Sequence, residues 1–309
     1  TDVGRICQEY IEKDSRIKYQ KIEKNLGISG NTNVCFSMAT GNFIGLFDHD
    51  DVMHPSLLFE CVKTVCEKDA DYVYTDEATF TSPNLDDLIV LHFKPDYSPD
   101  NLRANNYICH FFVVRREIAE KTGGLRPEYN GAQDYDYIFR CTEMAGKIVH
   151  IPRVLYHWRV HSASTADNPA SKLYAYEAGK KAIEGNLARC GEEGTVTLRS
   201  DYGFYDVDYK LRGTPLVSIL IPNKDQADTL RTCLESIKKK CMYPSYEILI
   251  IENNSTEEAT FSYYKELEAQ GIRVLKYPKQ GFNYSAINNF GVKEAKGEYL
   301  LFLNNDMEI

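Results

Sequence analysis

Short apolar runs alternate along the chain with longer amphipathic stretches, which is the pattern of strands followed by helices. The apolar segment 215–222 predicts a strand that is buried on both faces, as in a parallel sheet, and residues 246–251 predict the next strand. The other expected strands are 16–22, 43–47, 71–75, 107–114, 148–155, 195–198 and 205–211. The expected helices are 3–13, 54–67, 131–145, 169–190 and 230–240. This order predicts an α/β fold with a mixed, mostly parallel sheet flanked by helices.

A sequence repeat links two distant parts of the chain. Residues 33–51 and 289–307 share an Asn, an Ala, a Gly and a closing acidic cluster at one offset (289 − 33 = 256). In each copy a hydrophobic run, 43–47 or 299–303, leads directly into the polar cluster. Further upstream, residues 256–257 line up loosely with residues 1–2 at an offset one residue shorter (256 − 1 = 255). We therefore expect the chain to start inside one structural unit and to stop inside a second, partial unit of the same fold.

The two polar clusters carry candidate chemistry. Asp48 and Asp50 follow the first hydrophobic run, and Asn304 and Asp306 follow the second. Side chains at the carboxyl end of a strand lie where open α/β sheets bind ligands. Carboxylates are hard oxygen ligands that suit Mg²⁺ or Mn²⁺. The alternative is an acidic turn that only ends a strand, and the repetition favours a site.

Composition and charge narrow the class of protein. The length predicts about two domains. The net charge of −9 argues against a protein that binds nucleic acid by neutralising phosphates, so no nucleic-acid partner is expected. No apolar run approaches the ~20 residues that cross a bilayer. Nine scattered cysteines without metal-binding spacing fit a reducing compartment. We expect a cytoplasmic protein, either free or peripheral at the inner membrane face.

Several segments together resemble one enzyme family. Residues 215–222 (Pro-Leu-Val-Ser-Ile-Leu-Ile-Pro), 252–256 (Glu-Asn-Asn-Ser-Thr) and 304–306 (Asn-Asn-Asp) resemble the opening half of a family 2 glycosyltransferase with the Rossmann-like GT-A fold. Residues 25–33, 41–51, 74–77, 131–136 and 155–164 resemble the closing part of the same family. The resemblance covers nearly all of the chain outside 165–214. The arrangement is similar to bacterial tandem transferases that build surface polysaccharides.

The resemblance implies roles for the first acidic cluster and its surroundings. Asp50 would coordinate Mn²⁺ or Mg²⁺ at the donor diphosphate, and Asp48 would hold the metal hydration or the donor ribose. His161 matches a histidine that completes the metal or diphosphate site, and the alternative is a surface histidine just past a strand. His157, between Tyr156 and Trp158, is interpreted as structural.

Further positions match the closing part of the family. Asp134 matches the general base of inverting members, and its alternative role is a helix N-cap. Asp76 and Glu77 are expected to hold donor or acceptor hydroxyls, against the alternative of a strand-end turn. Arg159 is expected to pair with phosphate. Two asparagines of the matching 25–33 segment complete the expected donor-binding set, Asn25 and Asn33.

In the second unit, four positions match those that cradle the nucleotide base and ribose: Pro222, Asp225, Glu252 and Asn253. The family commonly has two aspartates where this chain has Glu252 and Asn253, and an aspartate where it has Asn304. Asp306 is retained as a metal-binding candidate. These amides predict weaker metal binding in the second unit.

The sequence thus predicts three segments: 1–165 as the closing part of one GT-A unit, 166–214 as a helix and connector, and 215–309 as the opening, nucleotide-binding half of another. The expected reaction is inverting transfer of a sugar from a nucleotide-diphosphate donor, UDP-linked first, to a glycan or lipid-linked glycan. The alternative is a sugar-nucleotide or glycan-binding fragment without turnover. Nucleotidyl transfer is disfavoured, because residues 222–225 lack a glycine-rich phosphate loop. Because each unit is incomplete, residues 215–309 are expected to fill the missing half of the first sheet, within one chain or in a swapped homodimer.

Overall fold

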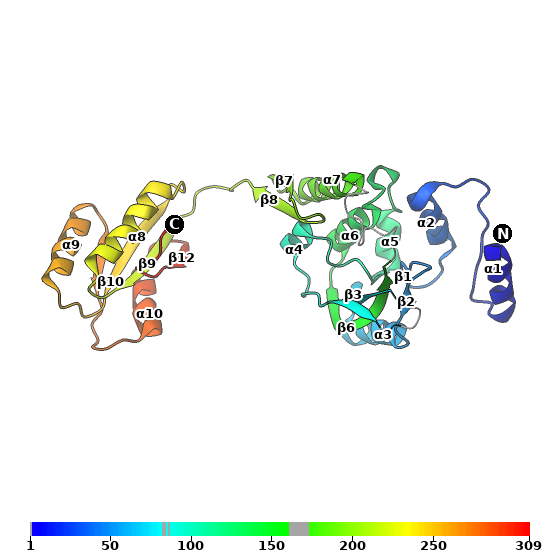
Figure 1. Ribbon diagram of the computed structural model, residues 1–309, viewed down its shortest axis with the longest axis horizontal. Coiled ribbons are helices and arrows are strands. Elements are labelled where there is room, and N and C mark those ends of the chain that lie inside the picture. Colours follow the sequence, from blue (N-terminus) through cyan, green and yellow to red (C-terminus); the bar gives the residue numbers. More distant parts are fainter. Residues whose placement is uncertain (1, 82–84, 86, 161–172) are drawn as a thin grey trace. The chain divides into compact units, whose positions relative to one another are not determined.

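The computed structural model describes residues 2–81, 85, 87–160 and 173–309. The chain divides into two compact units, Thr1–Lys210 (unit 1) and Leu211–Ile309 (unit 2), each with its own hydrophobic core (Figure 1). Within the described residues, no helix has both the length and the apolar character needed to cross a membrane.

Unit 1 contains a mixed sheet in the order β1-β5-β3-β6-β2, with β4 paired to β3. Its strands are β1 (Phe43–Gly45), β2 (Val52–Met53), β3 (Tyr72–Phe80), β4 (Leu88–His92), β5 (Phe112–Arg115) and β6 (Ile148–Arg159). Only the pairing of β3 with β6 is parallel, and the others are antiparallel. Parallel pairing therefore dominates unit 2 rather than unit 1.

Alternating side chains of β3 divide unit 1 into two cores. Tyr72 and Tyr74 belong to the core that includes α6, whereas Val73 packs with Leu57 and Cys61 of α3. The helices are α1 (Asp2–Lys13), α2 (Gly27–Met38), α3 (Leu57–Lys68), α4 (Pro99–Ala104), α5 (Arg116–Thr122), η1 (Pro127–Tyr129), α6 (Gln133–Met144) and α7 (Leu173–Cys190). The hairpin of β7 (Gly194–Leu198) and β8 (Tyr205–Tyr209) joins the α6 core through Val196.

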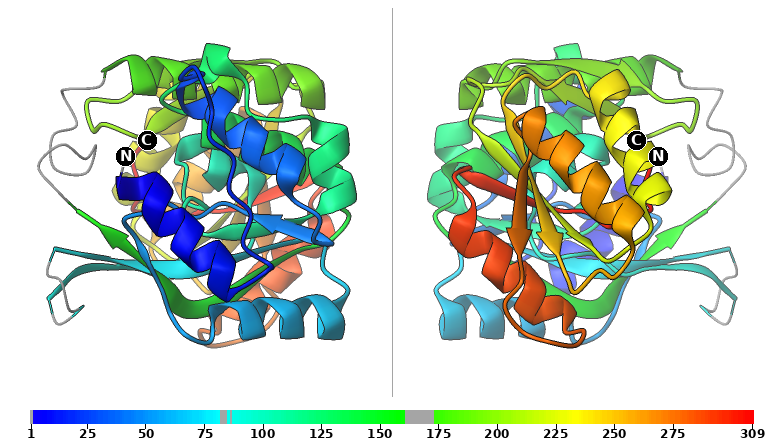
Figure 2. Two further views of the ribbon diagram at one scale, coloured as in Figure 1. Left: turned by 90° about the vertical axis from the view of Figure 1, so that its right-hand side faces the viewer. Right: turned by 90° about the vertical axis from the view of Figure 1, so that its left-hand side faces the viewer.

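Unit 2 is a parallel sheet in the order β11-β10-β9-β12. Its strands are β9 (Val217–Asn223), β10 (Tyr246–Glu252), β11 (Arg273–Lys276) and β12 (Tyr299–Phe302). Ile219 and Ile221 point toward α8 (Ala227–Lys240) and α9 (Glu258–Ala269), whereas Leu220 packs with Ile287 of α10 (Tyr284–Glu294). The three helices are yellow, orange and red in the right view of Figure 2. The strands predicted at 215–222 and 246–251 are thus confirmed as β9 and β10, and the side chains of β9 are buried on both faces of the sheet, as predicted.

The repeat is present in the structure as well as in the sequence. Helix α9 begins and ends 256 residues after α1 (258 − 2 and 269 − 13), and α10 ends 256 residues after α2 (294 − 38). Strand β12 begins 256 residues after β1 (299 − 43). The looser offset of 255 for the opening residues is therefore wrong, because the helix starts give 256.

Several element boundaries differ from the predictions. Residues 16–22 are not a strand, although the equivalent β11 is one, because in the described part of unit 1 no strand lies beside them to accept their hydrogen bonds. Strand β3 continues to Phe80 instead of ending before Asp76, since β4 and β6 pair with its second half. The expected strand 107–114 is formed only from Phe112. The fold class, an α/β architecture with a mixed sheet flanked by helices, is confirmed.

Candidate functional site

The acidic cluster after β1 is a tight loop that is fastened to β6. Asp51 is 8% exposed; its Oδ2 accepts a hydrogen bond from the Tyr156 hydroxyl, and its Oδ1 accepts one from the Arg159 N–H at 2.8 Å. The Arg159 Nε donates to the Asp50 carbonyl at 2.7 Å. Burial raises the pKa of Asp51, and these hydrogen bonds oppose that effect. Asp51 therefore anchors the loop, while Asp48 is exposed and Asp50 is half-buried.

Asp134 is the second residue of α6 and is half-buried. The N-cap of α6 is Ala132, so the alternative role of Asp134 as the N-cap is wrong. The Asn106 Nδ2 donates to the Asp134 Oδ2 at 3.1 Å. Asp136, two residues further on, is fully buried and pairs with the guanidinium of Arg140 at 2.8 Å, which is a structural role. Asp134 is thus the acidic side chain of this helix start that is left partly accessible.

Asp76 and Glu77 lie inside β3, each 2% exposed, so neither belongs to a strand-end turn. The Asp76 Oδ1 accepts from the Lys94 N–H at 2.9 Å and contacts the His150 Nε2 at 2.8 Å. The Glu77 Oε2 accepts from the His110 N–H at 2.6 Å and from the Lys94 Nζ at 3.3 Å. Burial raises the pKa of Glu77, but the charge of Lys94 and the hydrogen bonds outweigh burial and hold it well below its usual range. Both carboxylates are therefore held by protein groups.

His110 is a central residue that sequence reasoning did not identify. Its ring is stacked against Tyr156, with centroids 5.5 Å apart, and lies 4.9 Å from the ring of Trp158. Burial lowers the pKa of His110, but Glu77, Asp134 and Asp48 together raise it. The negative charges of Asp134 and of Asp48 in the acidic loop thus both favour the protonated imidazole. In the sequence His110 is a lone histidine within an apolar run, and that pattern does not indicate that it lies near the candidate site.

The asparagines of the 25–33 segment take part in local structure. The Asn33 side chain donates to the Leu125 carbonyl at 2.9 Å and accepts from the Leu125 N–H at 2.7 Å, which fastens α2 to the segment that follows α5. The Asn25 Oδ1 accepts from the Gly27 N–H at 2.9 Å at the start of α2. His157 contacts the Val52 carbonyl at 3.3 Å and is 9% exposed, as expected of a structural histidine. His161 lies outside the described residues.

In unit 2 the predicted residues follow neighbouring parallel strands. Pro222 lies near the end of β9, Glu252 ends β10 and Asn253 follows it, and Asn304 and Asp306 follow β12. Glu252 and Asn253 are buried, whereas Asn304 and Asp306 are exposed. The carboxyl ends of these strands meet at one edge of the sheet, where open α/β sheets bind ligands.

Asp225, in the loop after β9, is engaged by backbone groups. Its Oδ1 accepts from the N–H groups of Glu257 and Thr256, at 2.9 and 2.7 Å, at the start of α9. These hydrogen bonds hold the pKa of Asp225 below its usual range, with Glu257 contributing most. These contacts connect the loop after β9 to the loop that precedes α9.

The acidic loop fits a metal that is shared with a ligand better than one held by protein alone. Among the described residues, no group of three His, Cys, Asp or Glu side chains is placed to hold a metal ion. Asp48 and Asp50 offer two carboxylates on one loop. Magnesium is commonly bound by one or two carboxylates together with substrate phosphates, so this donor set fits such an ion.

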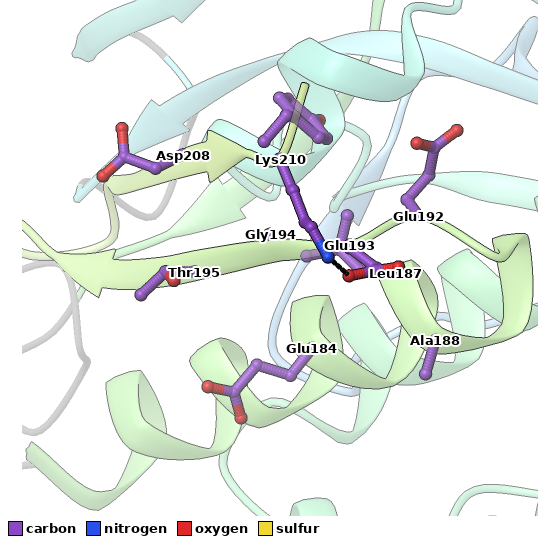
Figure 3. Close-up of a pocket in the computed structure, with 10 residues that line it drawn as sticks. Glu184, Leu187, Ala188, Glu192, Glu193, Gly194, Thr195, Asp208 and Lys210 are labelled. Carbon is purple, nitrogen blue, oxygen red and sulfur yellow. Dashed lines mark hydrogen bonds and ion pairs between the residues drawn. The ribbon is translucent and has the colours of Figure 1, made fainter. Parts of the chain in front are cut away.

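A separate hollow lies between α7 and the β7–β8 hairpin (Figure 3). The Lys210 Nζ pairs with Glu193 there at 2.6 Å. The other acidic lining residues are Glu184, Glu192 and Asp208. None of the predicted site residues lines this hollow, so it is not the candidate site.

Comparisons with known proteins identify relatives. The family model described as Glycosyl transferase family 2 matches residues 2–123 and 218–309. O-antigen biosynthesis protein RfbC of Myxococcus xanthus is 39% identical over 308 residues, 99% of this chain and 24% of that protein. Uncharacterized protein y4gI of Sinorhizobium fredii is 36% identical over 314 residues, 100% of this chain and 34% of that protein. The chain thus spans about a quarter to a third of the length of these relatives.

More distant similarity extends to other enzymes. Chondroitin synthase of Escherichia coli is 28% identical over 171 residues, 53% of this chain and 24% of that protein. The crystal structure of S. aureus TarS 1-349 in complex with UDP-GlcNAc is 16% identical, has a TM-score of 0.49, and covers 60% of this chain and 54% of that one.

Proposed function

Because the chain belongs to glycosyl transferase family 2, we propose that it transfers a sugar from a nucleotide-diphosphate donor to a glycan acceptor, with inversion at the anomeric carbon. One observation carries the proposal. Residues 106–110 connect the two candidate groups: the Asn106 amide donates to Asp134, and the His110 ring stacks on Tyr156, whose hydroxyl holds the acidic loop through Asp51. The reaction needs a carboxylate beside the acceptor hydroxyl and an acidic loop beside the donor diphosphate.

Asp134 is proposed as the general base. Its carboxylate takes the proton of an acceptor hydroxyl as that oxygen bonds to the anomeric carbon, and the bond from that carbon to the diphosphate oxygen breaks with its electron pair leaving on the nucleotide diphosphate. Partial exposure lets an acceptor reach Asp134. The nearby Asn106 amide fixes the direction of the carboxylate.

Asp50 is proposed to hold Mn²⁺ or Mg²⁺ at the donor diphosphate, with His161 as a further ligand, and Asp48 is proposed to hold the hydration of that ion or the donor ribose. A bound ion would supply charge neutralisation for the departing diphosphate. The chain's own contribution is the placement of the loop: Asp51 and Tyr156 fasten it to β6, and Arg159 binds its backbone. Arg159 also belongs to the proposed donor-phosphate contacts.

Family membership supports the proposed classes of donor and acceptor. A UDP-linked sugar is proposed as donor, and a glycan or lipid-linked glycan of a bacterial surface polysaccharide as acceptor; the name of the RfbC relative supports the latter. Such an acceptor would be met in the cytoplasm, at the inner membrane face. The strand-end residues of unit 2, Asp225 and Glu252 among them, are proposed as a nucleotide-binding set, with Asp306 as a weaker metal ligand.

We also propose a homodimer by exchange, in which residues 215–309 of one copy complete a sheet of the other. The described part of unit 1 has β1 at one end of its sheet, and that of unit 2 has β12 at one end, with all four β12 residues exposed. Unpaired edges favour pairing with another chain, and exchange of similar elements is a low-cost route to a dimer. Light scattering that gives a monomeric mass, with separate melting of unit 2, would contradict the exchange.

The transfer proposal is tested with Asp134→Asn. Release of UDP from a panel of UDP-sugars with Mn²⁺ and mixed glycan acceptors gives turnover, and calorimetry gives the affinity for UDP. A transferase loses turnover by a factor of about 10²–10⁴ and keeps its UDP affinity. If the wild-type chain binds UDP but shows no turnover that depends on Asp134, the alternative of a binding fragment is correct.

A further inference from the structure

Asn106 has an unusual place beside Asp134. Its Nδ2 donates to the Asp134 Oδ2 at 3.1 Å, while its own Oδ1 is buried and has no hydrogen-bond partner among the described residues. Buried polar atoms are nearly always paired, so this exception calls for a reason. Turning the amide over would put its oxygen against the carboxylate, because a carboxylate only accepts hydrogen bonds. The amide is thus held in the orientation that serves Asp134.

The backbone that follows Asn106 is clamped by a buried ion pair. Lys94 has a side chain that is 3% exposed, and its Nζ donates to Glu77 at 3.3 Å, to the Ile108 carbonyl at 3.0 Å and to the His110 carbonyl. Glu77 accepts from the His110 N–H at 2.6 Å. The Lys94–Glu77 pair therefore binds the carbonyls of Ile108 and His110 and the N–H of His110.

The clamped segment meets Asp134 at a second point. Burial, and then the nearby charge of Asp134, raise the pKa of the Cys109 thiol, which keeps that thiol protonated beside the carboxylate. Asn106 and Cys109 thus flank Asp134 from one short stretch of chain. Glu77 and Lys94 lie behind this stretch, buried, with their charges directed at its backbone.

We propose that Asn106 is a positioning residue for Asp134 and that the buried Lys94–Glu77 pair acts through it, by fixing residues 106–110. The proposal rests on the proposed role of Asp134 as the base. It assigns Glu77 to the scaffold of the base instead of to the sugar hydroxyls. Lys94 and Asn106 have no such assignment from the sequence pattern.

The expected effect is on turnover and not on donor binding. A base that is misplaced by about 1 Å can lose about a hundredfold in rate, so loss of the Asn106 amide is expected to lower kcat by about tenfold to a hundredfold. The KM for the donor stays within about twofold of wild type, because Asn106 contacts the base and not the acidic loop.

The test is steady-state UDP release by Asn106→Ala, with Asn101→Ala as the matched control at an exposed position of α4. Each is made in the wild-type chain and with Asp134→Asn. A residue that acts through Asp134 lowers kcat in the wild-type chain and has no further effect once Asp134→Asn is present. The pair Lys94→Met with Glu77→Gln is expected to behave in the same way, and removing both partners leaves no buried unpaired charge.

Two results would overturn the positioning role. One is a kcat of Asn106→Ala equal to that of Asn101→Ala. The other is an Asn106→Ala loss that is as large with Asp134→Asn as without it, since a general structural defect would act in both backgrounds. Full turnover of Asp134→Asn alone would instead refute the proposed base, and the positioning role with it.

Discussion

Replacing Tyr156 by Phe removes a single hydroxyl from the buried side of the acidic loop. Tyr156 is 1% exposed, and its hydroxyl donates to the Oδ2 of Asp51, which is 8% exposed. Asp51 then keeps only the hydrogen bond from the Arg159 N–H at 2.8 Å. The phenyl ring still fills the space of the phenol, so the change isolates the hydrogen bond from the packing.

The magnitude follows from the charge on the acceptor. Hydrogen bonds to charged groups contribute about 1.5–3 kcal/mol, so the free energy of unfolding of unit 1 is expected to fall by about that amount. Tyr72 provides a matched control, because it is fully buried on β3 and its hydroxyl has no hydrogen-bond partner among the described residues. Tyr72→Phe removes an unpaired polar atom and is expected to be neutral or stabilising.

Urea denaturation followed by tryptophan fluorescence measures both variants. The chain has one tryptophan, Trp158, which lies on β6 two positions after Tyr156 and therefore reports on unit 1. The account predicts a lower urea midpoint for Tyr156→Phe and an unchanged or higher one for Tyr72→Phe. Equal midpoints for the two variants would refute the reasoning that the Asp51 contact fastens the loop.

Three further predictions concern single contacts. Asp225→Asn is expected to lower the melting temperature of unit 2 at neutral pH. Because the folded pKa of Asp225 is depressed, its contribution to stability is present above its ordinary pKa of 3.8 and is lost as the pH falls through the folded value. Thermal melts of the wild-type and variant proteins should therefore converge in acid. Gly297→Ala would place a Cβ 2.5 Å from the backbone nitrogen of Ser218, so unit 2 should lose about 1–3 kcal/mol by circular dichroism while the tryptophan transition stays unchanged. Asp136→Ala leaves the buried guanidinium of Arg140 without its partner and should cost unit 1 about 3–5 kcal/mol in urea denaturation, with a smaller loss contradicting the buried pair.

The sequence pattern predicted elements best where burial on two faces shows in the residues themselves. The run 215–222 is apolar except for Ser218, and from Val217 it forms the inner strand β9. The repeat predicted two related units, and the matching ends of α1 and α9 confirm it. Residues 16–22 have the alternation of a strand, but a strand also needs a neighbour to accept its hydrogen bonds, and local sequence does not contain that information.

The candidate site remains a prediction, and its residues came from two kinds of signal. Asp48 and Asp50 were chosen because carboxylates follow a hydrophobic run, and Asp134 was chosen because it matches a position of the family that the chain resembles. Lys94 was missed because a lysine in a polar stretch has the pattern of a surface residue, and only the folded structure shows that it is buried against Glu77. His110 was missed because its partners come from β3 and β6, far away in the sequence.

Calorimetric titration of the chain with UDP, with and without Mn²⁺, tests the central claim most directly, with GDP and dTDP as comparison ligands. The account predicts that Mn²⁺ strengthens UDP binding, that Asp50→Asn removes this gain, and that Asp134→Asn retains it. Binding of UDP that is equal with and without the metal, or unchanged in Asp50→Asn, would contradict a metal-assisted nucleotide-sugar site at the acidic loop.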